Sequence, residues 1–355
     1  MTTLAERASG ILERGDVERL ELSRRGELLA QLYGDGEPRW VALTEQGERQ
    51  LDPGQDSELP LSARLAGLRR EQGASVLAWR PGRRMVVRVR RSDLPQGSAV
   101  VKALRAGRMR QALERHVEGS RAARAASLAA PEVLAVEPES ASFTLSWLGD
   151  ARVVVSGDRA EAFARLGRAL SRFQSEEAGP ELAAHGVDAE LDVLQELAAK
   201  AIKLRGALPS GWERAQATVE RALRASAGAA SVRTHRDLHD GQLLERDGTL
   251  ALLDFDLLCR ADEALDPANL LAHLELRALQ GLTDAAGARA CAEAFRAGYG
   301  RADDRDRERR LSVWGAASAL RLALVYHLRP PYAQLGPVLV GRALARLAEE
   351  RHGIR

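Results

Sequence analysis

One stretch, residues 231–269, most constrains how this chain can fold. Its first four residues are rich in β-formers and lead into His235 and Asp237. Asp247-Gly248 is a strong signal for a two-residue hairpin turn. The apolar run after that turn ends at Asp254. The pattern predicts a polar loop, a tight hairpin, and a strand that returns carboxylates to the end where the loop lies.

The acids and the amide of this stretch suit a metal ion and phosphate. They are Asp237, Gln242, Asp254 and Asp256. Mg²⁺ takes hard oxygen ligands and usually shares them with the phosphates of a substrate. If the hairpin brings these side chains together, they form a site for a divalent metal ion and phosphate oxygen.

The spacing resembles the active centre of the aminoglycoside phosphotransferase/choline kinase family, the small-molecule branch of the protein-kinase-like fold. The family pattern is His-x-Asp, an amide five residues after that Asp, and a further Asp after an apolar strand. A second family marker is Asp-Pro followed by a helix. The matching residues here are His235, Asp237, Gln242, Asp254 and Asp266-Pro267. The resemblance covers roughly residues 73–355.

The resemblance implies a role for each of these residues. Asp237 would accept or orient the proton of a substrate hydroxyl. Gln242 and Asp254 would hold Mg²⁺ between the β- and γ-phosphates, with Asp256 as a further oxygen ligand. Structural roles are expected for His235 and Asp266.

Lysine is scarce in this chain, which makes Lys102 informative. Three of the 52 basic residues are lysine, and the others are arginine. Lys102 lies in an apolar run, where an ammonium group without a partner is costly. It resembles the strand lysine that contacts the α- and β-phosphates in kinases. The helix predicted at 109–126 offers Glu118 or Glu114 as its ion-pair partner; the alternative is an edge-strand lysine that faces water.

Residues 73–150 are predicted to form the nucleotide-binding small lobe. No GxGxxG loop is present, but residues 80–84 resemble a Pro-Gly-Arg-Arg turn seen in some family members. Backbone N–H groups of that turn, with Arg83 or Arg84, would cover the phosphates; a solvated basic hairpin is the alternative. The resemblance places the interlobe hinge, whose main chain would hold the adenine, at Ser146, Trp147 and Leu148.

The rest of the chain divides into two further parts. Residues 151–355 show helical spacing of apolar side chains and predict a helical large lobe with the catalytic loops and acceptor pocket. Residues 1–72 indicate a small antiparallel meander, which we expect to pack on the small lobe rather than act as a regulatory cap. The predicted fold class is therefore α+β: a bilobal protein-kinase-like fold with a small antiparallel-sheet N-lobe, a mostly helical C-lobe and an N-terminal extension.

Composition excludes several other classes of protein. The net charge of +2 gives no strong field for nucleic acid or a membrane surface. No run approaches the roughly 20 apolar residues that span a bilayer. Cys259 and Cys291 have no metal or redox spacing, so a reducing cytoplasm is the expected location. A monomer or a homodimer is expected.

The predicted function is transfer of the γ-phosphoryl of ATP or GTP to a hydroxyl of a small molecule. That acceptor would be aminoglycoside-like, an amino-alcohol or a sugar. Gln242 stands where the family usually has asparagine, and its extra methylene moves the carbonyl oxygen. Asp256 stands where protein kinases have glycine, as in many small-molecule kinases. The alternative function is a catalytically weak kinase-like protein that binds or regulates.

Overall fold

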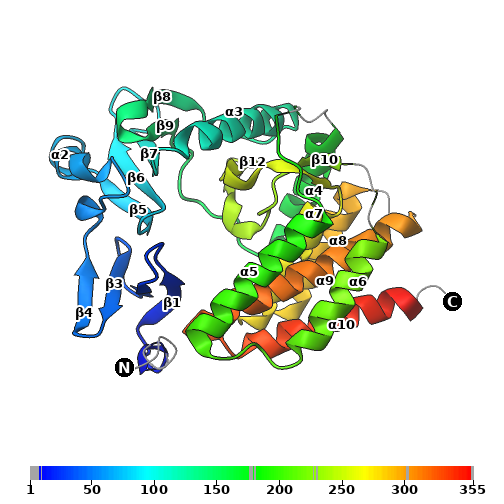
Figure 1. Ribbon diagram of the computed structural model, residues 1–355. Coiled ribbons are helices and arrows are strands. Elements are labelled where there is room, and N and C mark those ends of the chain that lie inside the picture. Colours follow the sequence, from blue (N-terminus) through cyan, green and yellow to red (C-terminus); the bar gives the residue numbers. More distant parts are fainter. Residues whose placement is uncertain are drawn as a thin grey trace.

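A computed structural model describes residues 8, 10–175, 179, 181–226, 228, 231–300 and 304–352. A sheet at the N-terminus and a second sheet lie at one end, and a group of long helices forms the other end (Figure 1). The predicted α+β, bilobal architecture is confirmed. No helix within these ranges is both long and apolar enough to cross a bilayer.

The N-terminal sheet is an antiparallel meander in the order β1-β2-β3-β4. Its strands are β1 (Val17–Leu22), β2 (Leu28–Leu32), β3 (Arg39–Thr44) and β4 (Gly47–Leu51). The Trp40 indole N–H donates to the Trp79 carbonyl of the small lobe at 2.9 Å. The Leu20 N–H donates to the Leu328 carbonyl of the large lobe at 3.2 Å. The meander therefore packs on both lobes and not, as we expected from the sequence, on the small lobe alone.

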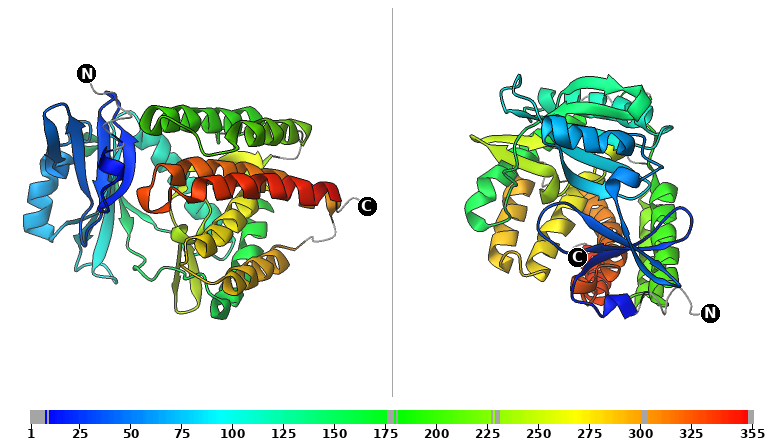
Figure 2. Two further views of the ribbon diagram at one scale, coloured as in Figure 1. Left: turned by 90° about the horizontal axis from the view of Figure 1, so that it is seen from below. Right: turned by 90° about the vertical axis from the view of Figure 1, so that its left-hand side faces the viewer.

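Apolar side chains account for this double packing. Leu20 and Leu28 share a buried cluster with Leu204 and Leu328 of the large lobe. The opposite side of the meander, through Trp40, joins the core of the small lobe. In the view from the end, the meander lies below the small-lobe strands and in front of the large-lobe helices (Figure 2, right).

The small lobe is a five-stranded antiparallel sheet flanked by two helices. The strands, in the order β5-β6-β7-β9-β8, are β5 (Ser75–Arg80), β6 (Arg84–Arg90), β7 (Ser98–Leu104), β9 (Ser142–Ser146) and β8 (Val133–Glu137); the helices are α2 (Ser62–Gln72) and α3 (Met109–Ala125). Val86 pairs with Lys102, and Arg84 pairs with Leu104. Because side chains alternate along a strand, this register puts Arg84 and Lys102 on one face of the sheet.

The large lobe holds seven helices and two short ribbons within the described ranges. The helices are α4 (Ala160–Ser175), α5 (Val187–Arg205), α6 (Trp212–Ala225), α7 (Leu265–Leu279), α8 (Ala285–Tyr299), α9 (Arg305–His327) and α10 (Leu335–His352). One ribbon pairs β10 (Ser231–Thr234) with β13 (Cys259–Asp262), and the other pairs β11 (Leu243–Arg246) with β12 (Thr249–Leu252). Asp247 and Gly248, both at positive φ, make the predicted hairpin turn between β11 and β12.

Helices α4 and α8 touch through their backbones at two glycines. A Cβ atom on Gly298 would lie 2.0 Å from the Ala164 carbonyl oxygen. Gly298→Ala is therefore expected to lower the free energy of unfolding by about 1–3 kcal/mol, because the helices must move apart. Urea denaturation measures the change. The matched control is Gly341→Ala in α10, where nothing lies within 4 Å; it should be neutral or stabilise by up to about 1 kcal/mol. Equal effects of the two substitutions would contradict this packing.

Candidate active site

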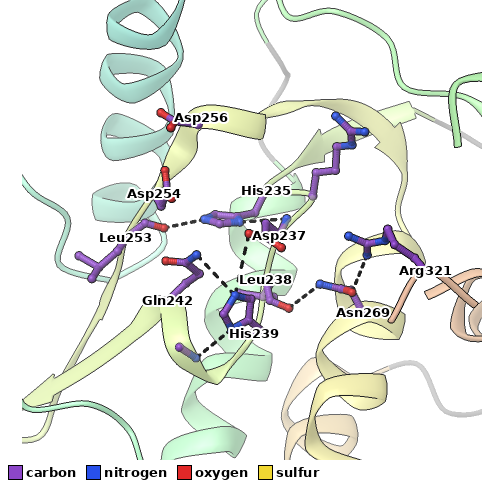
Figure 3. A network of polar contacts seen from close by, with 12 residues as sticks. His235, Asp237, Leu238, His239, Gln242, Leu253, Asp254, Asp256, Asn269 and Arg321 are labelled. Carbon is purple, nitrogen blue, oxygen red and sulfur yellow. Dashed lines mark hydrogen bonds and ion pairs between the residues drawn. The ribbon is translucent and has the colours of Figure 1, made fainter. Parts of the chain in front are cut away.

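His235 braces the loop that carries Asp237. Its side chain is fully buried, and its Nε2 donates to the Leu253 carbonyl at 2.8 Å. The Asp237 N–H donates to His235 Nδ1 at 3.3 Å. A carbonyl can only accept and an amide N–H can only donate, so the imidazole proton lies on Nε2. One side chain thus ties the loop at Asp237 to the residue just before Asp254 (Figure 3).

Asp266, on the first turn of α7, fixes the backbone of the same loop. Its two carboxylate oxygens each accept a 2.7 Å hydrogen bond, one from the His235 N–H and one from the Arg236 N–H. Arg236 has a φ of 70°, a left-handed conformation that is unfavourable for a side chain of this size. Burial raises the pKa of Asp266 to about 6, against the two backbone donors. These contacts support the structural roles expected for His235 and Asp266.

The Asp237 carboxylate is left open by this arrangement. Among the described residues its one contact within 4 Å of a basic group is His239 Nε2 at 3.9 Å, and the carboxylate accepts no hydrogen bond. Burial lowers the pKa of His239, which disfavours a charge on that imidazole. The side chain is 35% exposed. Figure 3 shows the loop of Asp237 beside the strand end that carries Asp254. The carboxylate is therefore free to accept a hydrogen bond from a substrate.

Two cations of the small lobe meet two carboxylates of the large lobe. Lys102 Nζ lies 2.9 Å from Asp254 Oδ1 and 2.5 Å from Asp256 Oδ1. Arg84 Nη1 lies 3.1 Å from Asp254 Oδ2 and 3.0 Å from Asp256 Oδ2. We call these four residues the interlobe ion cluster. It brings Lys102, from the β7 strand, to the two acids that follow β12.

Electrostatics keep Lys102 and Asp254 ionised in this cluster. Burial disfavours the charge on Lys102, but the attraction of Asp254 and Asp256 outweighs it, and the pKa of Lys102 is raised. Burial likewise favours the neutral form of Asp254, yet Lys102 and Arg84 hold the pKa of that carboxyl well below its usual range. Two half-buried carboxylates so close together need compensating positive charge.

The donor set fits a hard divalent cation. Asp254 and Asp256 present four carboxylate oxygens, and all four contact a cation in the interlobe ion cluster. Gln242 lines the same cleft as Asp254, with its side-chain nitrogen 3.5 Å from His239 Nε2. Its carbonyl oxygen makes no hydrogen bond to other described residues. Carboxylate and amide oxygens of this kind are the ligands that Mg²⁺ prefers.

A cleft of about 510 Å³ runs from the interlobe ion cluster to the hinge. It has an apolar end, with Val86, Val100 and Leu145, and a charged end. Most residues predicted for the hinge, the phosphates and the metal ion line it; they are Ser146, Trp147, Leu148, Lys102, Arg84, Gln242 and Asp254. Arg83 and Asp256 line a neighbouring pocket instead. The Arg88 guanidinium covers the Trp147 ring at 4.6 Å.

The prediction that Lys102 pairs with a glutamate of α3 is wrong. Glu118 accepts from the buried Arg233 at 2.7 Å, and Glu114 pairs with Arg110 at 2.9 Å. The residues of α3 that face inward share helical spacing; they are Ala112, His116, Gly119 and Ala123. Glu114 and Glu118 lie off that face, and Arg233 needs a counter-ion because it is fully buried.

His116 stands in the cleft near Lys102 instead, and the sequence interpretation missed it. The ring is buried, and its Nε2 lies 3.0 Å from the Pro131 carbonyl oxygen. Burial lowers the pKa of His116 to about 4, so the imidazole adds no charge beside the ammonium. The signal in the sequence was its spacing of four residues from Ala112 on the apolar face of the helix.

Comparison with family models decides the family. The model of the phosphotransferase enzyme family matches residues 74–311, which is more than half of the chain. The chain belongs to this family. The resemblance noted from the His-x-Asp pattern is thereby confirmed, and this phosphotransferase is a small-molecule kinase. Comparison with curated proteins gives no match.

Solved structures agree on the fold of this phosphotransferase. Amicoumacin kinase, in complex with AMP-PNP and Ca²⁺, superposes with a TM-score of 0.55 at 14% identity, over 82% of this chain and 94% of that one. An aminoglycoside phosphotransferase from Streptomyces rimosus, in complex with ADP and streptomycin, gives a TM-score of 0.52 at 22% identity, over 73% of this chain and 98% of that one. A choline/ethanolamine kinase family protein from Mesorhizobium loti gives a TM-score of 0.51 at 17% identity, over 82% of this chain and 92% of that one.

Proposed function

We propose that this phosphotransferase moves the γ-phosphoryl of ATP or GTP to a hydroxyl group of a small molecule. The interlobe ion cluster carries the proposal. It joins Lys102 of the small lobe to Asp254 and Asp256 of the large lobe, at the charged end of a cleft that reaches the hinge. This is the end at which the phosphates of a nucleotide bound at the hinge would lie.

Asp237 supplies the base in this proposal. Its carboxylate accepts no hydrogen bond from the described residues, has only His239 Nε2 at 3.9 Å beside it and is partly exposed, so it can accept the proton of the acceptor hydroxyl. The hydrogen bonds of His235 and Asp266 hold the loop so that the position of Asp237 is fixed before a substrate binds.

Lys102 and Arg84 act on the phosphates. In the structure both cations are engaged with Asp254 and Asp256. When another cation neutralises the two carboxylates, the ammonium and guanidinium groups can turn to phosphate oxygens. Transfer then depends on positioning and on neutralising charge, with little covalent chemistry for the protein to perform.

Asp254, Asp256 and Gln242 would hold Mg²⁺, which when bound neutralises charge on the β- and γ-phosphates. The structural neighbours support the need for nucleotide and divalent metal, since amicoumacin kinase holds AMP-PNP and Ca²⁺. The backbone of Ser146, Trp147 and Leu148 is proposed to bind the nucleotide base at the apolar end of the cleft.

A titration with ATP, with and without Mg²⁺, tests this function. Trp147 lines the cleft, so its fluorescence should report binding. We expect Mg²⁺ to tighten binding by roughly tenfold or more, since ionic contacts contribute about 1.5–3 kcal/mol each. Asp254→Asn should lose this dependence on Mg²⁺, while the control Asp247→Asn, in the β11–β12 turn, should keep it. Failure of wild type to bind nucleotide under either condition would favour the kinase-like binding protein instead.

A further inference from the structure

A second pocket, of about 390 Å³, adjoins the interlobe ion cluster at Asp256. None of its lining residues lines the 510 Å³ cleft between the interlobe ion cluster and the hinge, which we call the nucleotide cleft after the function proposed above. Five of its lining residues are arginines: Arg24, Arg83, Arg105, Arg108 and Arg115. We call it the arginine pocket. Asp256 is the single acidic residue among those that line it.

The five arginines reach the pocket from separate parts of the chain. Arg24 belongs to the turn between β1 and β2, and Arg83 to the turn between β5 and β6. Arg105 and Arg108 lie between β7 and α3, and Arg115 lies on α3 itself. The fold, and not one basic run of sequence, concentrates the positive charge here. The N-terminal meander takes part in the pocket through Arg24.

Little negative charge balances the pocket. Asp256 is already shared by Lys102 and Arg84 in the interlobe ion cluster. Glu58 lies 3.7 Å from Arg24, and Glu21 lies 4.0 Å from Arg83. Elsewhere, arginines of this chain pair closely with acids, for example Arg277 with Asp240 at 2.8 Å.

Arg105 and Arg108 carry the unbalanced charge. Their side chains form no hydrogen bond or ion pair with any described residue. Burial, and then the charges of Arg24 and Arg108, lower the pKa of Arg105, as expected where cations crowd together. An anion in the pocket would relieve this repulsion.

Helix α3 adds to the positive field. Its N-cap residue is Arg108, which makes no capping hydrogen bond, and its first turn contains no acid. The first N–H groups of a helix and its dipole favour an anion, so an arginine at this end is unfavourable unless one is bound. Gln111, in the first turn, lines the pocket and offers a further donor.

We propose that the arginine pocket binds a phosphate or carboxylate group of a small-molecule ligand. The planar forks of arginine match both groups with paired hydrogen bonds. Because the pocket meets the interlobe ion cluster at Asp256, this ligand lies beside the phosphoryl group to be transferred. That placement rests on the proposed function. The anionic group belongs either to the acceptor itself or to a separate effector.

Binding of inorganic phosphate tests the pocket while AMP-PNP and Mg²⁺ saturate the nucleotide cleft. Calorimetry at low ionic strength should show phosphate binding to wild type. The double variant Arg105→Gln/Arg108→Gln should bind it at least roughly tenfold more weakly, because two charged donors are lost. Arg69→Gln/Arg70→Gln, on the surface of α2, removes the same net charge and should bind phosphate as wild type does.

The proposal is overturned if phosphate does not bind, or if the two double variants are affected equally. AMP-PNP binding is measured on the same samples. If Arg105→Gln/Arg108→Gln loses phosphate binding but binds AMP-PNP normally, the result supports the pocket. Absence of AMP-PNP binding in wild type contradicts the proposed function and leaves the phosphate measurement to decide the pocket alone.

Kinetics separate the two sources of the anion. If the acceptor carries it, the double variant raises KM for a phosphorylated or carboxylated acceptor by roughly tenfold and leaves KM for ATP unchanged. If a separate effector carries it, inorganic phosphate changes the rate with a neutral acceptor, and the double variant loses that response. The absence of both responses would contradict a ligand beside the phosphoryl group.

Discussion

Asp237→Asn is expected to lower kcat by roughly 10²–10⁴-fold while the Kd for nucleotide stays nearly unchanged. Asparagine keeps the shape of the side chain but cannot take a proton. The carboxylate makes no hydrogen bond to other described residues, so its loss should disturb neither the loop nor the nucleotide cleft. Steady-state kinetics with an acceptor found by product screening, together with ATP titration, measure the two quantities.

The matched control for this prediction is Asp247→Asn. Asp247 occupies the β11–β12 turn with a φ of 50°, a conformation that asparagine adopts readily, and its side chain is 90% exposed. The kcat of Asp247→Asn should equal that of wild type. If Asp237→Asn keeps wild-type kcat as well, the proton acceptor is a different group.

Asp266→Ala is expected to lower the free energy of unfolding by about 2–5 kcal/mol. The substitution leaves two backbone N–H groups, the buried one of His235 and the part-buried one of Arg236, without an acceptor, and each such loss costs about 1–3 kcal/mol. It also frees Arg236 to leave its left-handed conformation, so the position of Asp237 should become less defined. Urea denaturation gives the change in free energy, and kcat is expected to fall with it.

Two further variants make this measurement specific. Asp284→Ala removes one N-cap, a hydrogen bond from the Gly287 N–H, and should lower the free energy of unfolding by about 1 kcal/mol. Asp266→Asn keeps one acceptor oxygen, so its loss in the free energy of unfolding should lie between the losses of Asp284→Ala and Asp266→Ala. A loss in Asp266→Ala no larger than that in Asp284→Ala would show that the two hydrogen bonds do not hold the loop.

The arrangement of residues 231–269 could be predicted from sequence because its signals are local. The Asp247-Gly248 turn fixes the hairpin between β11 and β12, so the spacing from Asp237 to Asp254 translates directly into proximity. Lys102 was recognisable as a rare lysine in an apolar strand, and the register of β6 with β7 places it toward the cleft.

The pairing of Lys102 with Asp254 and Asp256 could not be predicted, because it depends on how the two lobes meet. Glu118 instead forms an ion pair with Arg233, a buried residue far along the chain, and no local sequence pattern predicts that pair. The same holds for β13, four residues long, which forms a ribbon only by pairing with β10. Contacts of the N-terminal meander with Leu328 are also distant in sequence.

Transfer of a labelled γ-phosphoryl group from ATP is the most direct measurement of the central claim, that Lys102, Asp237 and Asp254 serve one reaction. Wild type, Mg²⁺ and labelled ATP are incubated with cationic, neutral and anionic hydroxyl compounds, and products are identified by mass. We predict that at least one compound gains a single phosphoryl group with wild type and with Asp247→Asn, and that Asp237→Asn and Lys102→Met form little or none. A wild-type protein that binds ATP yet phosphorylates none of these compounds, or equal product from Asp237→Asn, would contradict the account.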